Sequence, residues 1–160
     1  MLRRDQTTQI KGKTTGYVAL GFDAGNGMCG ADGVFGWVSG GKVVASANYL
    51  NCSRRAQGLR SVCPDVSKLR VRAGKATEDI IRGVKPDSYL TGLSGETDGV
   101  YTTIRFSRKL DTGNLNDVQL RLDRTTPVVW ALGATPAISY HGSTTRGSGA
   151  IDLLPVKYKH

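Results

Sequence analysis

Apolar residues along the chain fall into short runs, several of which alternate with polar residues, and clusters of Gly, Asn, Asp and Pro separate the runs. Runs at intervals of about 8 to 12 residues are typical of the strands of an all-β sandwich. No segment shows the sustained period of an amphipathic helix, although residues 77–82, with Thr77 as cap, are compatible with one helical turn. The predicted strands are residues 9–13, 16–22, 33–38, 43–49, 66–72, 89–94, 100–109, 118–122 and 128–132.

Turn-forming residues mark the boundaries between these runs. Residues that tolerate the positive φ angles of tight hairpins occur at Asn26-Gly27, Gly40-Gly41 and Asp98-Gly99. Asp23, Asp32 and Asp98 lie near turns, where a carboxylate usually accepts hydrogen bonds from backbone amides. The polar, glycine-rich residues 142–149 look most like a linker.

The length of the chain sets the number of domains. A chain of 160 residues holds one substantial core and is too short for two domains of ordinary size. We assign residues 9–155 to a single domain, residues 1–8 to a tail or truncated start, and residues 156–160 to a C-terminal tail. No apolar run approaches the roughly 18 residues of a membrane-spanning helix. Residues 1–6 lack the long apolar stretch of a secretory signal peptide, so we expect either a cytosolic protein or a piece of a longer precursor.

The formal net charge of +9 raises the hypothesis of nucleic-acid binding, because clustered Lys and Arg attract phosphate. In residues 68–72 the basic residues alternate with apolar ones, which predicts one solvated face of a strand. No helix-turn-helix, zinc or RNP motif accompanies them, so we predict no nucleic-acid partner. A basic surface suits an acidic redox partner or an anionic matrix equally well.

Two side chains with donor atoms for a metal stand in distinctive loops at opposite ends of the chain. Met28 lies in the motif GMCGAD and His141 lies in the motif SYHG. Apart from Met1 and His160, the sequence has no other methionine or histidine. A thioether and an imidazole are the axial ligands of haem iron in many cytochromes, so haem binding is the first functional hypothesis.

Each motif also has a more ordinary interpretation. A lone Met28 would be a flexible core residue, and a lone His141 would be a hydrogen-bonded surface residue, but the glycines around Met28 leave room for a large flat ligand. Tyr140 places an aromatic wall beside His141. If one ring nitrogen of His141 binds iron, the other should donate to a carbonyl, a carboxylate or water. Residues 25–30 also match the dinucleotide pattern GxGxxG, but a strand is predicted after them instead of the helix that pattern requires.

Further residues are candidates for secondary roles. Arg146 is either a solvated loop cation or a partner for a haem propionate, which suits the fork of the guanidinium group. Trp37 lies on a strand-like segment, where it packs in the core or lines a pocket. No GxSxG motif and no local pair of carboxylates indicates hydrolysis, so we predict that the domain has no catalytic residues.

The three cysteines suggest one pair and one remainder. Cys52 and Cys63 flank a short basic segment, and we predict a disulfide between them worth about 3 kcal/mol in the chain-entropy description, which indicates an oxidising compartment. Cys29 is then a buried thiol, an intermolecular partner or a rival iron ligand. Asn51 begins an N-glycosylation sequon, which has meaning in a secreted protein.

Several stretches carry a family resemblance in their order and spacing. They are residues 16–22 (GYVALGF), 28–38 (MCGADGVFGWV), 102–108 (TTIRFSR), 129–133 (VWALG) and Tyr140-His141. Together they resemble the DOMON domain over residues 9–154, and residues 48–65 more narrowly resemble the DOMON domains of Skeletor- and Knickkopf-like extracellular proteins. The resemblance implies an immunoglobulin-like β-sandwich that binds haem b or sugars. In its haem-binding members, residues at the positions of Met28 and His141 ligate the iron.

The residues and the resemblance together lead to one main expectation. We expect an extracellular or cell-surface b-type cytochrome domain that exchanges electrons with a redox partner protein or domain, including a membrane-anchored one. DOMON domains usually have more strand sequence ahead of the segment matched by residues 16–22, so we expect a piece of a longer precursor. The alternative is a non-catalytic module without haem that binds carbohydrate or a cuticle or matrix polymer.

Overall fold

The computed structural model of the protein describes residues 5–23, 27–28, 30–49, 90–115 and 117–153. All regular secondary structure in these ranges is β-strand, which confirms the all-β prediction. No helix within them is long and apolar enough to cross a membrane. The predicted strand at residues 66–72 and the helical turn at residues 77–82 lie outside the described residues.

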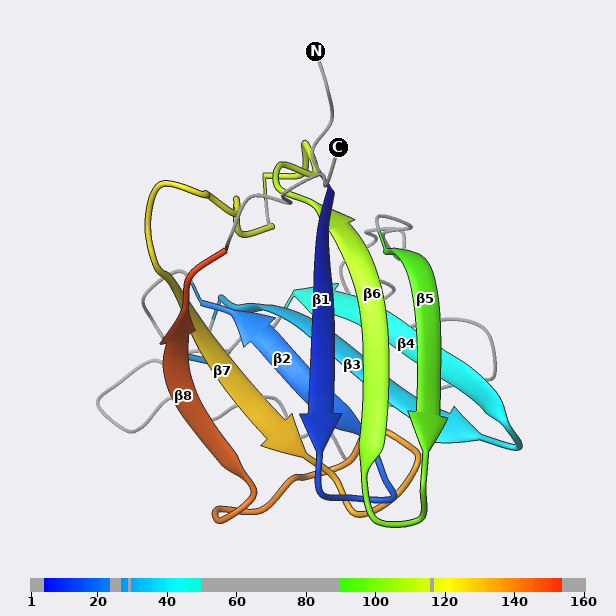
Figure 1. Ribbon diagram of the computed structural model, residues 1–160. Helices are drawn as coiled ribbons and strands as arrows, with labels where there is room; N and C mark the ends of the chain where they lie inside the picture. Colours follow the sequence, from blue (N-terminus) through cyan, green and yellow to red (C-terminus); the bar gives the residue numbers. More distant parts are fainter. Residues whose placement is uncertain (1–4, 24–26, 29, 50–89, 116, 154–160) are drawn as a thin grey trace.

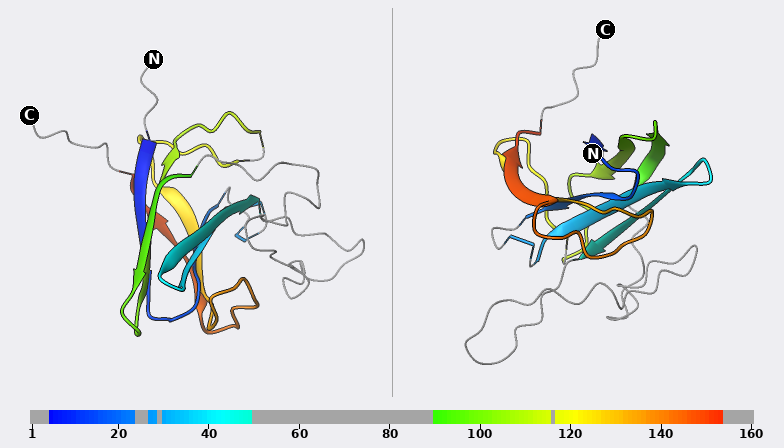
Figure 2. Two further views of the ribbon diagram at one scale, coloured as in Figure 1. Left: turned by 90° about the vertical axis from the view of Figure 1, so that its right-hand side faces the viewer. Right: turned by 90° about the horizontal axis from the view of Figure 1, so that it is seen from below.

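Two antiparallel sheets pack face to face as a sandwich (Figure 1). The larger sheet has the strand order β4-β3-β2-β7-β8, and the smaller one has the order β1-β6-β5. Seen from the side, the sheets form separate layers (Figure 2). The strands are β1 (Asp5–Gly12), β2 (Val18–Phe22), β3 (Asp32–Ser39), β4 (Lys42–Tyr49), β5 (Thr91–Thr97), β6 (Thr102–Lys109), β7 (Thr126–Leu132) and β8 (Arg146–Ile151).

Two predictions for the C-terminal part of the chain are wrong. Residues 118–122 were predicted as a strand from their apolar alternation, but they form an irregular segment. Their apolar side chains do pack inward, and the amide of Leu120 donates to the Leu110 carbonyl at 2.8 Å instead of joining a ladder. Residues 142–149 look like a linker, yet β8 begins at Arg146 and pairs with β7. Small exposed residues dominate β8, so it shows no apolar alternation.

The central strands of the five-stranded sheet carry buried apolar side chains on both faces. Its inner face meets the three-stranded sheet in a core of Val18, Val34, Ile104 and Phe106. Side chains of successive strand residues point to opposite faces, so the neighbours of Val18 and Val34 point outward. The outward-facing cluster contains Tyr17, Ala19, Ala31, Phe35, Trp37 and Ala131, with Met28, Val129 and Ile138 packed against it. We call this set the outer cluster, and it marks the face where loops cover the sheet.

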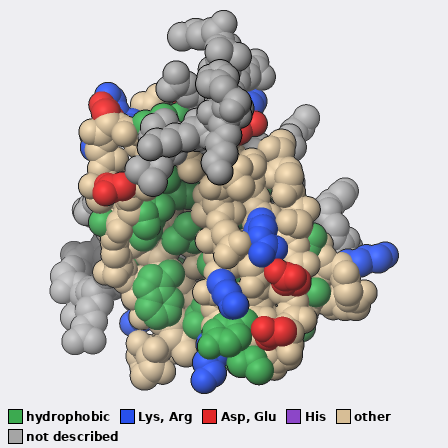
Figure 3. Space-filling model, in the orientation of Figure 1, with side chains coloured by type: hydrophobic (Ala, Val, Ile, Leu, Met, Phe, Trp, Pro, Cys, Tyr) green, Lys and Arg blue, Asp and Glu red, His purple; other side chains and the backbone are tan. Residues whose placement is uncertain are grey.

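The three-stranded sheet does not cover the whole inner face. In the orientation of Figure 1, apolar side chains gather on the side where β7 and β8 lie (Figure 3). Trp130 is 40% exposed. It stands two residues after Val128 on β7, so its side chain points to the same inner face of the sheet. A Cβ atom at Gly147, which stands opposite Trp130 in the ladder, would overlap the indole ring. Glycine at residue 147 therefore lets the ring lie against β8.

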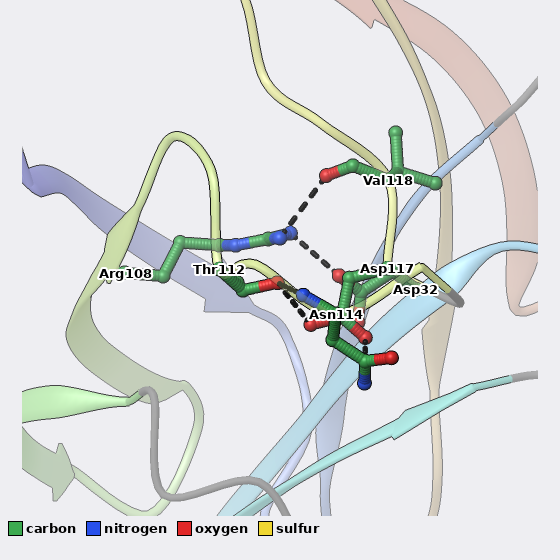
Figure 4. A network of polar contacts seen from close by, with 6 residues as sticks. All are labelled: Asp32, Arg108, Thr112, Asn114, Asp117 and Val118. Atoms are coloured by element: carbon green, nitrogen blue, oxygen red, sulfur yellow. Dashed lines mark hydrogen bonds and ion pairs between the residues drawn. The ribbon is translucent and has the colours of Figure 1, made fainter.

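A buried ion pair joins the two sheets (Figure 4). A guanidinium nitrogen of Arg108 on β6 lies 2.7 Å from a carboxylate oxygen of Asp32 on β3, and both side chains are almost fully buried. The same guanidinium donates to the Val118 carbonyl at 3.1 Å and lies over the Phe22 ring. Nothing in the sequence indicated this ion pair of Asp32. Asp23 and Asp98 do accept hydrogen bonds from turn amides, as predicted.

Candidate functional site

A pocket of about 310 Å³ lies on the outer face of the five-stranded sheet. The loop before β3 contributes Met28, the segment between β7 and β8 contributes His141, and β8 contributes Arg146. The structure therefore brings together three residues that the sequence singled out from distant positions. Residues of β2, β3 and β7 form the floor between them.

The floor is built from two rows of directly opposed residues that cross β3, β2, β7 and β8. The first row is Phe35, Ala19, Ala131 and Arg146. The second row is Gly33, Gly21, Val129 and Ser148. All of these residues line the pocket, and most are small. A strand residue without a large side chain leaves the backbone open to close approach, so the small residues of the floor leave room for a planar ligand.

Met28 is held by hydrogen bonds at the start of β3. The Asp23 carboxylate accepts the Gly27 amide at 3.0 Å, and the Met28 carbonyl accepts the Ala31 amide at 3.3 Å. Asp32 follows directly and is fixed by its ion pair with Arg108. Met28 packs against the outer cluster and also lines the pocket. Met28 is thus partly buried like a core residue, and its side chain is also accessible from the pocket.

The ring of His141 has a defined tautomer. Its Nδ1 atom lies 2.8 Å from the carbonyl oxygen of Gly142. A carbonyl only accepts hydrogen bonds, so Nδ1 carries the proton, and in the neutral ring Nε2 keeps the free lone pair. The Tyr140 ring stacks on the imidazole with centroids 5.4 Å apart and planes at 27°. A hydrogen bond of this kind to the second ring nitrogen is the usual support of a metal-binding histidine.

The segment that carries His141 is tied to the core beneath it. The Tyr17 hydroxyl donates to the Ser139 carbonyl at 2.7 Å, and burial raises the pKa of Tyr17 to about 12. On the other side, the Thr145 hydroxyl donates to the His141 carbonyl, and the Leu132 amide donates to the Thr145 carbonyl at 2.8 Å. These bonds place His141 between two fixed points.

The electrostatics of the pocket favour an anionic group at its rim. Among the described residues that line it, His141 and Arg146 are the ionisable ones, and none is a carboxylate. Arg146 is exposed and stands opposite Ala131 at the edge of the floor. In the described ranges, no three His, Cys, Asp or Glu side chains gather to hold a metal ion. Metal binding here would depend on a different donor set.

Two further predicted cofactor-binding residues, Trp37 and Tyr140, are not among the described residues that line this pocket. Trp37 is buried in the outer cluster, which agrees with the interpretation as a core residue. Tyr140 is 66% exposed and reaches the site only through its stacking on His141. The glycosylation residue Asn51 and the predicted disulfide partners Cys52 and Cys63 lie outside the described residues, as does Cys29.

The sequence reasoning missed residues that shape the pocket without offering a donor atom to a ligand. Gly21 and Gly33 stand opposite each other in neighbouring strands, and both predicted strands contain them. Strand-interior glycines were the available signal, because they weaken a strand unless a ligand or another backbone approaches. Tyr17 and the Asp32–Arg108 pair gave no comparable signal, since their partners become visible only in three dimensions.

Comparisons with known proteins identify the family of the chain and a solved structure with a similar fold. A family model described as the DOMON domain matches residues 3–133, a range that includes Met28 and ends before His141 and Arg146. Among solved structures, the crystal structure of the cytochrome b domain of pyranose dehydrogenase from Coprinopsis cinerea is similar, with a TM-score of 0.52 and 13% sequence identity. The match covers 93% of this chain and 68% of that one. No curated protein matches the chain.

Proposed function

The chain belongs to the DOMON domain family and shares the fold of a cytochrome b domain, and from this premise we propose that it binds haem b in the outer-face pocket. Met28 and His141 are the proposed axial ligands. The observation that carries the proposal is that these two residues, far apart in the sequence, line the same pocket. The proposed location is extracellular or at the cell surface, within a longer protein.

The residues present fit the chemistry of haem. A thioether and the unprotonated Nε2 of a neutral imidazole are the donor pair of many cytochromes. The pocket volume of about 310 Å³ lies at the lower end of the roughly 300–1,000 Å³ of small-molecule and cofactor sites. The small side chains of the floor allow a flat macrocycle to approach the sheet.

Arg146 has a separate part in this proposal. It is exposed at the rim of a pocket whose described lining has no carboxylate. A guanidinium group pairs with a carboxylate through two parallel hydrogen bonds. We assign Arg146 to a haem propionate, which orients the ligand without touching the iron.

The ligand set indicates electron transfer rather than catalysis. Haem b supplies one-electron redox chemistry at its iron when it is bound. Met28 and His141 would hold the iron from two protein donors, so no coordination site would be left for a substrate or oxygen. The domain therefore needs a redox partner protein or domain, membrane-anchored or not, and any catalysis lies in that partner. The alternative of a carbohydrate- or matrix-binding module has no observation in the pocket that favours it.

Spectroscopy of the reconstituted protein tests the proposal. The chain is incubated with hemin, freed of excess hemin and measured in the oxidised and dithionite-reduced states. The expected spectrum is that of six-coordinate haem, with a Soret band that moves on reduction and resolved α and β bands. Met28→Ala and His141→Ala should each open a coordination site to carbon monoxide, whereas an Arg146→Gln variant should keep the axial spectrum and release haem faster. A protein that takes up no hemin overturns the proposal.

A further inference from the structure

Tyr17 is a buried, hydroxyl-bearing residue that the proposed ligation does not use. It directly precedes β2, is 1% exposed and belongs to the outer cluster. Its hydroxyl donates to the Ser139 carbonyl at 2.7 Å. Ser139 stands two residues before His141, so this hydrogen bond acts close to the proposed iron ligand.

The backbone of Tyr17 binds the beginning of the same segment. Its amide donates to the Thr135 carbonyl at 3.0 Å, and its carbonyl accepts the Gly133 amide at 2.9 Å. A Cβ atom at Gly133 would overlap the Tyr17 ring, so glycine is needed there for the ring to lie against the backbone. One residue thus holds both the start and the far end of the stretch that leads from β7 to His141.

The hydroxyl is the separable part of this arrangement. The backbone bonds fix the segment at residues 133–135, whereas the bond to Ser139 fixes it next to His141. Beyond His141, the Thr145 hydroxyl donates to the His141 carbonyl. If the Tyr17 hydroxyl is removed, the segment keeps its start, the packing of Ile138 and its Thr145 contact, but it loses the hydrogen bond at Ser139.

We propose that Tyr17 is a positioning residue for His141: its hydroxyl bond to the Ser139 carbonyl keeps the imidazole in place to bind iron. This inference rests on the proposed haem function. The ring packs with the outer cluster, with its centroid 6.0 Å from that of Phe35, so the hydroxyl is aimed at the carbonyl by a rigid support. Because burial raises the pKa of Tyr17 to about 12, the hydroxyl stays a donor throughout the neutral range.

Tyr17→Phe in the full chain tests the inference, because it removes the hydroxyl and keeps the ring. In the reconstituted, reduced protein, carbon monoxide should bind about tenfold faster, since losing one hydrogen bond raises the fraction of detached His141 by roughly that factor. In the protein without hemin, amide hydrogen exchange should accelerate at residues 134–141 and remain unchanged in β2 and β3. The matched control is Tyr101→Phe, an exposed tyrosine at the turn before β6, which should change neither readout.

Gly133→Ala is a second variant, in which the added Cβ atom would overlap the Tyr17 ring. It keeps the hydroxyl but displaces the ring that aims it, so it should reproduce the faster carbon monoxide binding. Unchanged binding in both variants overturns the inference while leaving the proposed function intact. Equal acceleration of exchange throughout the sandwich also overturns it, because Tyr17 would then be a core residue only. If the parent protein takes up no hemin, the proposed function fails first and the inference fails with it.

Discussion

The two faces of the five-stranded sheet differ although the same strands build them. On the inner face, β2 places Val18, Leu20 and Phe22 against large apolar neighbours. On the outer face, the alternate positions of the same strand are Ala19 and Gly21, and both line the pocket. On β2, the inner face carries large side chains and the outer face carries small ones.

This difference separates stability from binding. Large buried side chains supply the apolar area that drives folding, whereas glycine inside a strand weakens it. The outer face therefore gives up part of the stabilisation that its strands could provide. In return, the loops that carry Met28 and His141 line a pocket above a floor of mostly small residues. Changes on the inner face should act on folding, and changes on the outer face should act on the ligand.

The largest expected effect comes from the ion pair on the inner side. Asp32→Ala leaves the fully buried Arg108 without its carboxylate, and removing one member of a buried pair costs about 3–5 kcal/mol. The free energy of unfolding, measured with urea, should fall by that amount. The control is Asp123→Ala, which breaks the exposed pair with Arg121 and should leave the urea midpoint unchanged. A loss below about 1 kcal/mol for Asp32→Ala would contradict the buried pair as a clamp between the sheets.

A substitution in the floor of the pocket should weaken hemin binding. Ala131→Leu directs a larger side chain into the pocket between Ala19 and Arg146. The larger side chain takes space that the ligand needs, so hemin affinity, measured by fluorescence quenching, should fall about tenfold to a hundredfold. The melting temperature of the hemin-free protein should fall less than for Asp32→Ala, because overpacking costs about 1–3 kcal/mol. Ala150→Leu, at an exposed position of β8, is the control. Equal hemin affinity of the two variants would show that the ligand does not lie over Ala131.

A truncation on the inner face sharpens the contrast. Val34 is fully buried between the sheets, and it directly follows the floor residue Gly33. Val34→Ala should cost about 2 kcal/mol of unfolding free energy through lost burial and a residual cavity. The absorption spectrum of the loaded protein should stay the same. A spectral change from Val34→Ala would mean that the two faces are coupled more strongly than the alternation of side chains suggests.

The smallest effect lies at alkaline pH. Burial raises the pKa of Tyr17 to about 12, above the value of about 10 expected in the unfolded chain. The folded state therefore holds the phenolic proton more tightly, so this contribution is intact below about pH 10 and declines as the pH rises toward 12. Tyr17→Phe should make the melting temperature fall less steeply above about pH 10, and Tyr101→Phe should not. Identical slopes would contradict the burial of the hydroxyl.

Local pattern was enough to predict the centre of the sandwich. The predicted strands at residues 16–22 and 33–38 correspond to β2 and β3, because their buried faces give a strong apolar signal. The family resemblance is confirmed by the family model and the fold. Met28 and His141 could be named as candidates because each is rare in the sequence. Their ligation of iron remains a prediction.

The parts that sequence reasoning missed depend on contacts between distant residues. β8 shows no alternation because its residues are small and mostly exposed, and only its pairing with β7 makes it a strand. Asp32 looks like a turn residue until β6 brings Arg108 within 2.7 Å. Residues 118–122 alternate like a strand, but they pack on the core without a ladder partner. In each case, a neighbour from another part of the fold decides the structure.

The position of β8 in the chain also affects how the protein matures during synthesis. Met28 leaves the ribosome before the opposite wall and the rim, which arise from His141 and from Arg146 on β8, the last strand in chain order among the described residues. A nascent chain can form most of the sandwich before that wall exists. If the proposed function holds, haem capture is therefore expected only after β8 has emerged from the ribosome.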